Sequence, residues 1–195
     1  MLSFIRFVER LSMWMGKSFA WCILVLTFAV SYEVFVRYVL RDPTSWAYDI
    51  SYIMYGALFI MAGAYTLSRG GHVRGDVIYR LLSTRAQASI DLVLYFIFYF
   101  PGVLAFIYSG YGFARMAWSF KEKSIFSPAG IPIYPLKVLI PVAGVLLLLQ
   151  GIVEVIRCVL CLRTGNWPQR LHDVEELEKV ILEQQASQRD RGAQP

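Results

Sequence analysis

The segment 68–76, which reads SRGGHVRGD, concentrates residue types that bind metals or transfer protons. It holds His72, one of only two histidines in the chain, and Asp76 four residues later. Imidazole and carboxylate groups both bind zinc, but a zinc site needs further protein ligands, and the sequence offers none in a matching pattern. We therefore predict a turn here, with Gly70 and Gly71 ending one helix and Asp76 capping the next.

A second candidate is the pair Glu33 and Arg37, which lie four residues apart at the end of a long apolar stretch. Glu placed N-terminal to Arg at this spacing favours an ion pair on one face of a helix. One interpretation is a carboxylate that couples the movement of a proton or an ion. The interpretation that we favour, because Arg37 is so well placed, is a structural pair that anchors the helix or contacts a partner protein.

A third candidate is the C-x-x-C motif of Cys158 and Cys161. This spacing occurs in zinc and redox sites, but no second cysteine pair or histidine pair completes such a site here. We predict that these two residues and Cys22 are small apolar packing residues.

These residues must be positioned in a membrane, because the chain is too apolar for a soluble domain of its length. The mean hydropathy is +0.50 and 57% of the residues are hydrophobic. A helix that crosses a bilayer needs about 20 mostly apolar residues. Four stretches meet this requirement, at residues 18–39, 47–67, 88–112 and 136–160. The sequence predicts an all-α integral membrane protein with four transmembrane helices.

The segments that flank the four spans are predicted to be helical in part without crossing the membrane. In residues 1–17 the apolar side chains recur at helical spacing and charged residues, including Glu9, lie elsewhere around the helix, which is typical of an amphipathic helix in the membrane interface. Residues 171–185 predict a short cytoplasmic helix. We therefore divide the chain into an interfacial helix (1–17), a four-helix transmembrane domain (18–160) and a cytoplasmic tail (161–195).

The distribution of Lys and Arg predicts the orientation. Thirteen of the 19 basic residues lie on the side of the spans that carries both termini. This excess predicts that both termini are cytoplasmic. The net charge of +5 then reflects topology and attraction to anionic membrane lipid, and it predicts no binding to nucleic acid.

The predicted spans lack the side chains that catalysis or cofactor binding inside a membrane would need. His72 and His172 both lie outside the spans, which excludes a haem held by two histidines within the bundle. The spans contain no Ser–His–Asp set, no paired inward carboxylates and no phosphate-binding glycine loop. We predict no catalytic, cofactor-binding or metal-binding residues, no cofactor and no enzymatic activity, and a protein that positions another protein.

Small residues predict where the spans approach one another closely, because small side chains allow helices to pack in lipid. They lie at Gly56-Ala57 and Gly63-Ala64 in the second span and at Gly144 and Gly151 in the fourth. Pro101-Gly102 predicts a bend within the third span. The loop that follows the third span has three prolines among apolar residues, so it is predicted to be extended and to pack on this protein or on a partner.

Three stretches together resemble a known family. They are FVRYVLRDPTSWAYDIS at 35–51, FIMAGAYTLSRGGHVRGDVI at 59–78 and IPIYPLKVLIPVAGVLLLLQGIVEVIR at 131–157. In order and spacing the chain resembles the small membrane subunit, or Q subunit, of tripartite ATP-independent periplasmic (TRAP) transporters. The similarity extends over nearly the whole chain, including its size and its four-helix layout.

The resemblance implies a multi-pass protein of the bacterial inner membrane that pairs with a large multi-span TRAP membrane subunit. The large subunit would import an organic acid with sodium, and a periplasmic substrate-binding protein would deliver that acid. The small subunit would brace the large one and help to dock the binding protein.

The resemblance also implies which residues support the subunit interface or the local structure. Several positions that recur in the family are occupied here, and we add the acidic member of the predicted ion pair. The candidate residues are Glu33, Arg37, Trp46, Asp49, His72 and Asp76.

Two other hypotheses stay open from the sequence. The chain could be a small autonomous proton-coupled carrier that works as a homodimer through Glu33. It could also be a membrane enzyme or an electron-transfer subunit, for which the lack of histidine within the spans leaves the least support.

Overall fold

The computed structural model describes residues 2–69 and 82–167. Its elements are the helices α1 (Leu2–Ala20), α2 (Cys22–Phe35), α3 (Ala47–Ser68), α5 (Thr84–Leu94), α6 (Phe100–Ser119) and α7 (Tyr134–Thr164), with the π-helical segments η1 (Val36–Leu40) and η2 (Tyr95–Tyr99). The described residues form no β-strand and contain only one isolated β-bridge. The predicted 171–185 helix lies outside the described residues.

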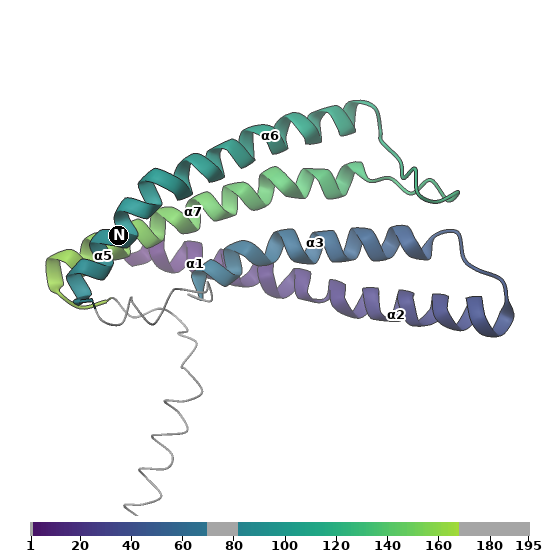
Figure 1. Ribbon diagram of the computed structural model, residues 1–195, viewed down its shortest axis with the longest axis horizontal. Coiled ribbons are helices and arrows are strands. Elements are labelled where there is room, and N and C mark those ends of the chain that lie inside the picture. The colour runs from purple at the N-terminus through teal and green to yellow at the C-terminus, as the bar shows by residue number, and fades with distance from the viewer. Residues whose placement is uncertain (1, 70–81, 168–195) are drawn as a thin grey trace, which may run out of the picture.

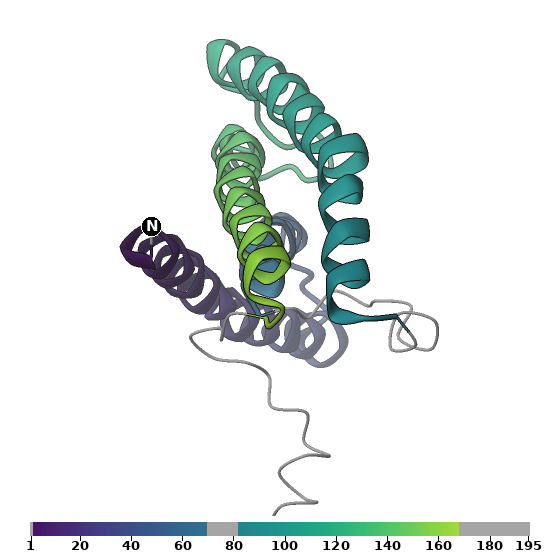
Figure 2. The ribbon, with the colours of Figure 1, turned by 90° about the vertical axis from the view of Figure 1, so that its left-hand side faces the viewer.

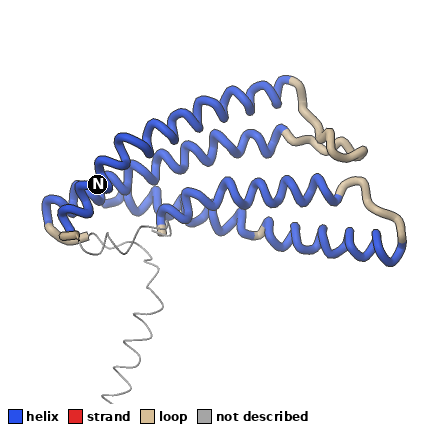
Figure 3. Tube along the Cα trace, viewed as in Figure 1, coloured by secondary structure: helices blue, strands red, loops and turns tan. Residues whose placement is uncertain are grey.

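The four predicted spans are present as four helical stretches that are long and apolar enough to cross a membrane. They cover Ser3–Leu40, Ala47–Ser68, Thr84–Ser119 and Tyr134–Thr164. Figure 3 shows these helices and, at one end of the molecule, the two loops that join them in pairs. The prediction of an all-α membrane protein with four transmembrane helices is therefore confirmed.

The helices form an open row and not a closed bundle. Figure 1 shows α6, α7, α3 and α2 side by side in that order. Helix α7 packs against α6 and α3, and α1 packs against both α3 and α7 at the end where the chain begins. Viewed end-on to the helices, α1 and α6 lie on opposite sides of α7 (Figure 2). Helix α7 is accordingly the most enclosed span, while α5–α6 is the most exposed.

The small residues in the fourth span lie where α6 approaches α7, as their pattern predicted. A Cβ atom added to Gly144 would stand 2.6 Å from Ile107 Cγ1, and one added to Gly151 would stand 2.3 Å from Tyr99 Cε1. The Tyr99 hydroxyl donates a hydrogen bond of 2.8 Å to the Leu147 carbonyl, which holds its ring over the glycine. These glycines therefore set the distance between the two helices.

The predicted bend in the third span takes the form of the π-helical segment η2. This wider turn ends at Tyr99, two residues before Pro101. Proline has no backbone N–H and its ring clashes with the carbonyl four residues earlier, so a local change of helical pitch relieves the clash.

Helix α1 differs from the expected interfacial helix in the face that it buries. It leads through a single turn residue, Trp21, into α2. Its buried side chains include Val8 and also Glu9, while Phe7 and Trp14 are exposed. The helical pattern in the sequence placed Glu9 away from the apolar face, because such a pattern holds no information about a partner elsewhere in the chain. That partner is Arg157 of α7.

Helix α1 approaches α3 closely at Gly16. A Cβ atom there would stand 2.5 Å from Tyr65 Cβ, which cannot move without moving α3. Replacement of Gly16 by Ala should destabilise the fold by about 1–3 kcal/mol, because the helices must separate. The measurement is thermal unfolding in detergent, followed with a thiol-reactive dye that detects the cysteines as they become exposed.

The matched control is Gly112→Ala in α6, since no atom of the described residues lies within 4 Å of a Cβ at that position. This variant should melt within error of the wild type or slightly above it, because Ala favours helix more than Gly does. Equal melting temperatures for the two variants would show that α1 does not depend on the close approach at Gly16.

Candidate functional site

Four of the six candidate residues gather at one end of the row of helices. We call this the loop end, because it carries the connection 41–46 between η1 and α3 and the loop 120–133 between α6 and α7 (Figure 1). The opposite end, where α1 begins, is called the terminal end. Glu33, Arg37, Trp46 and Asp49 all belong to the last turns of the first span or to the start of α3.

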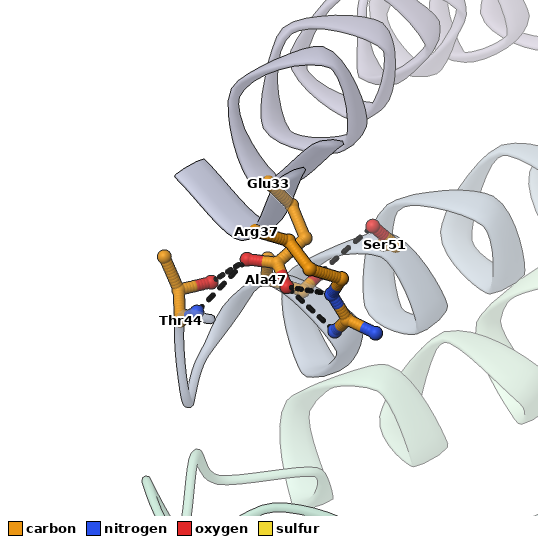
Figure 4. A network of polar contacts seen from close by, with 5 residues as sticks. All are labelled: Glu33, Arg37, Thr44, Ala47 and Ser51. Atoms are coloured by element: carbon orange, nitrogen blue, oxygen red, sulfur yellow. Dashed lines mark hydrogen bonds and ion pairs between the residues drawn. The ribbon is translucent and has the colours of Figure 1, made fainter. Parts of the chain in front are cut away.

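Glu33 is the centre of the first polar network at the loop end (Figure 4). Its Oε1 atom accepts hydrogen bonds from Arg37 Nε at 2.9 Å and from Arg37 Nη2 at 2.6 Å. Its Oε2 atom accepts from the backbone N–H of Thr44 at 3.1 Å and from the Thr44 hydroxyl. The ion pair predicted from the spacing is therefore present, and the same carboxylate also fastens the 41–46 connection to the end of α2.

The connection itself is shaped by its turn residues. The helix ends in the π-helical turn η1, after which Arg41 adopts a left-handed conformation with φ of 55°. Asp42 donates its backbone N–H to the Val36 carbonyl at 3.3 Å, and Pro43 then prevents the helix from continuing. This places Thr44 where it can reach Glu33.

Trp46 packs beside this network and directly precedes the next helix, α3. Its ring stacks on that of Tyr32, with ring centroids 5.9 Å apart and planes inclined by 22°. Trp46 also stands immediately before α3, at the capping position of that helix. An aromatic side chain at the end of a span is typical of the membrane–water interface.

Asp49 forms the second polar network, which fixes the loop 120–133. It lies in the first turn of α3 and is only 2% exposed. Oδ1 accepts a hydrogen bond of 2.5 Å from the hydroxyl of Ser124, and Oδ2 accepts one from the hydroxyl of Ser127. Beside it, the ring of Phe126 meets that of Tyr48 edge-on at 6.0 Å. A buried carboxylate with both oxygens hydrogen-bonded holds the loop on α3.

Two further contacts complete the loop. Its two sides pair through their backbones, with Ser124 N–H donating to the Ile131 carbonyl at 2.8 Å and Ile133 N–H donating to the Glu122 carbonyl at 3.0 Å. Lys137, at the start of α7, forms an ion pair of 2.5 Å with Glu122. The extended loop predicted from its prolines thus packs on its own protein.

Residues 8–161 match the family described as tripartite ATP-independent periplasmic transporters, DctQ component. The chain belongs to this family. A comparison with curated proteins gives no match. The DctQ family is the small membrane component of TRAP transporters, so the resemblance seen in the sequence is confirmed, and the chain is a multi-pass membrane component of a transporter.

In this DctQ chain a third polar network lies at the terminal end, and the sequence did not predict that it joins Glu9 of α1 to Arg157 of α7. The ion pair between Arg157 of α7 and Glu9 of α1 is buried, with the two side chains 3% and 5% exposed. Next to it, Ser12 donates a hydrogen bond of 3.3 Å to Gln150 Oε1, and Gln150 Nε2 lies 3.5 Å from Glu154 Oε1. Removal of one member of a buried ion pair costs about 3–5 kcal/mol, because the other charge is left buried without a partner, so loss of either Glu9 or Arg157 should disfavour the packing of α1 on α7.

The remaining candidates divide into described and undescribed residues. His72 and Asp76 lie outside the described residues. Cys158 and Cys161 are buried in α7 as free thiols and Cys22 is a half-buried free thiol, so their role as packing residues stays a prediction. Within residues 2–69 and 82–167, no group of three or more His, Cys, Asp or Glu side chains is placed to hold a metal.

Sequence reasoning missed the hydroxyl residues that complete the loop-end networks. Thr44, Ser124 and Ser127 carry the contacts to Glu33 and Asp49. The sequence does contain a signal for Thr44: it directly follows Asp42-Pro43, which ends the helix, so it lies where the chain turns back toward Glu33. Ser124 and Ser127 lie more than 70 residues from Asp49, and one sequence offers no signal for such a pair.

Replacement of Asp49 by Ala should release the loop 120–133 while the helices stay folded. Tryptic cleavage after Lys121 and Lys123 should become at least about tenfold faster, because hydrogen bonds to a charged group contribute about 1.5–3 kcal/mol each. The measurement is limited proteolysis of the purified protein in detergent, with the cleavage sites identified by mass spectrometry.

The control is Asp42→Ala, which removes an exposed acid from the neighbouring connection. Cleavage after Lys121 and Lys123 should proceed at the wild-type rate in that variant. If Asp49→Ala also cleaves at the wild-type rate, Asp49 does not hold the loop.

Proposed function

We propose that this chain braces the large membrane subunit of a TRAP transporter that imports an organic acid with sodium, and that it helps to dock the periplasmic substrate-binding protein. The observation that supports this most strongly is the DctQ match over residues 8–161, which includes nearly all of the described helices. The fold supports the same proposal, because its open row of helices leaves wide apolar surfaces uncovered.

The uncovered surfaces lie on the two edges of the row of helices. Trp21, directly before α2, is 70% exposed, Phe28 on α2 is 73% exposed, and Tyr108 on α6 is 83% exposed. Apolar faces of this extent are covered in a membrane either by lipid or by another membrane protein. An open row offers a large partner much more surface than a closed bundle of four helices would.

The polar networks support a bracing role and not an autonomous carrier. Glu33 has both oxygens engaged by Arg37 and Thr44, and it stands near the helix end. A carrier that uses a carboxylate to move protons needs that group to lose and regain its partners during each cycle. The contacts of Glu33 instead hold a turn in place.

The proposal includes an orientation and a location. We place the chain in the bacterial inner membrane with both termini in the cytoplasm, so that the loop end faces the periplasm. The distribution of Lys and Arg supports this orientation. The loop end then faces the binding protein, and the segment with His72 and Asp76 belongs to the cytoplasmic side, where we propose that it contacts the large subunit or lipid.

The residue roles follow from this arrangement. Glu33, Arg37, Trp46 and Asp49 are proposed as structural residues that shape the periplasmic surface. We also keep the division of the chain into 1–17, 18–160 and 161–195 as a proposal, with the first segment serving as an arm that packs on α3 and α7.

Reconstitution into liposomes tests the proposal. Uptake of an organic acid under an inward sodium gradient should require this chain, the large subunit and the soluble binding protein together. Omission of this chain should reduce the rate of uptake about tenfold or more. The opposite result is uptake by this chain alone, driven by a proton gradient, which would establish the autonomous carrier instead.

A Glu33→Gln variant distinguishes the two mechanisms within the same assay. Gln keeps an oxygen that can accept from Arg37 or Thr44, so a structural role predicts uptake within about threefold of the wild type, since a loss of about 1 kcal/mol or less is typical of an ion pair with one partner in solvent. The pH dependence of uptake should not change. A loss of uptake together with a loss of its pH dependence would assign proton coupling to Glu33.

A further inference from the structure

We propose that the loop 120–133 carries the surface on which the soluble binding protein docks, with Ile125 and Phe126 at its centre and Lys121 and Lys123 at its rim. This inference rests on the proposed function and adds the contact surface to it. The partner that fits is a folded soluble protein that presents a shallow apolar recess surrounded by acidic side chains.

The first supporting feature is the exposure of the two apolar side chains. Ile125 is 88% exposed and Phe126 is 63% exposed. Both lie between the spans Thr84–Ser119 and Tyr134–Thr164, and not within either one. Apolar side chains on a surface outside the membrane, flanked by polar residues, mark protein interaction sites.

The second feature is that the loop is held in one conformation before any partner arrives. Buried Asp49 accepts hydrogen bonds from Ser124 and Ser127, which stand on either side of the two apolar residues. The Phe126 ring also rests against Tyr48. A surface fixed in this way loses little conformational entropy on binding, which increases affinity.

The third feature is charge. At the loop end, the ion pairs Glu33–Arg37 and Glu122–Lys137 are neutral as pairs. Five other charged side chains at this end form no ion pair with any described residue. Four are basic (Arg41, Arg115, Lys121 and Lys123) and one is acidic (Asp42). A positive field at the loop end attracts an acidic partner and raises the rate of association.

The alternative occupant is the headgroup layer of an anionic membrane, which also attracts basic and apolar residues. Two observations favour a protein. Trp46, Trp118 and Tyr134 stand at the helix ends, where aromatic residues mark the membrane interface, and the loop extends past those ends (Figure 1). The hydrogen bonds of Asp49 also fix a defined shape, which recognition of a protein requires and insertion into lipid does not.

The test uses the complete membrane complex of this chain and its large subunit in nanodiscs of neutral lipid. The binding protein is the soluble analyte, and surface plasmon resonance measures its Kd. Ile125→Ser and Lys123→Glu should each raise the Kd about tenfold or more, because central apolar residues and steering charges dominate small interfaces. Higher salt should weaken wild-type binding and have less effect on Lys123→Glu.

The controls separate a contact from a folding defect. Ile125→Leu keeps an apolar tip and should bind as the wild type does. Arg163→Glu reverses an exposed charge at the terminal end and should leave the Kd unchanged. Each variant is first checked for co-purification with the large subunit. Should Ile125→Ser fail that check, Lys123→Glu, which changes an exposed side chain, still decides the question.

The outcomes distinguish the two levels of the proposal. Wild-type binding with unchanged Kd in Ile125→Ser and Lys123→Glu overturns the docking surface and leaves the proposed function intact. No binding to the wild-type complex, with uptake that does not need the binding protein, overturns the proposed function itself. If the variants keep the wild-type Kd for the binding protein but no longer bind vesicles of anionic lipid, the loop is a membrane anchor and the proposed docking surface is wrong.

Discussion

The close approach of the other helices to α7 is the constraint on which the rest of this structure depends. Lipid gives no hydrophobic driving force between helices, so association relies on van der Waals packing at short distance. Gly144 and Gly151 provide that distance on the α6 side, and Ala143 is buried on a neighbouring face. With α7 enclosed in this way, α6 and α2 are left at the edges with most of their apolar surface free for a partner.

Polar contacts then fix the position and rotation of the helices relative to one another, which packing alone leaves undefined. Apolar helices of similar composition could slide or rotate against each other at small energetic cost. The network of Glu9 with Arg157 sets the position of α1 on α7 at the terminal end, and the bonds from Ser124 and Ser127 to Asp49 set the loop on α3 at the loop end. A buried carboxylate is costly to leave without partners, so each network specifies one arrangement.

The part of this structure that could be predicted from sequence is the part encoded locally. The four spans follow from hydropathy, and the Glu33–Arg37 pair follows from a spacing of four residues on one helix. The burial of Glu9 could not be predicted, because its partner Arg157 is 148 residues away and a helical pattern treats a charge as solvent-facing. The role of Asp49 was implied by family position alone, and its serine partners came only from the structure.

The central claim is that this chain is a brace for a larger membrane protein and has no function as a free unit. The mass of the assembly purified after co-expression with the large TRAP subunit, measured by native mass spectrometry, tests that claim most directly. The account predicts a stable complex with one copy of each subunit. A homodimer of this chain, with the large subunit absent from the purified material, would contradict it.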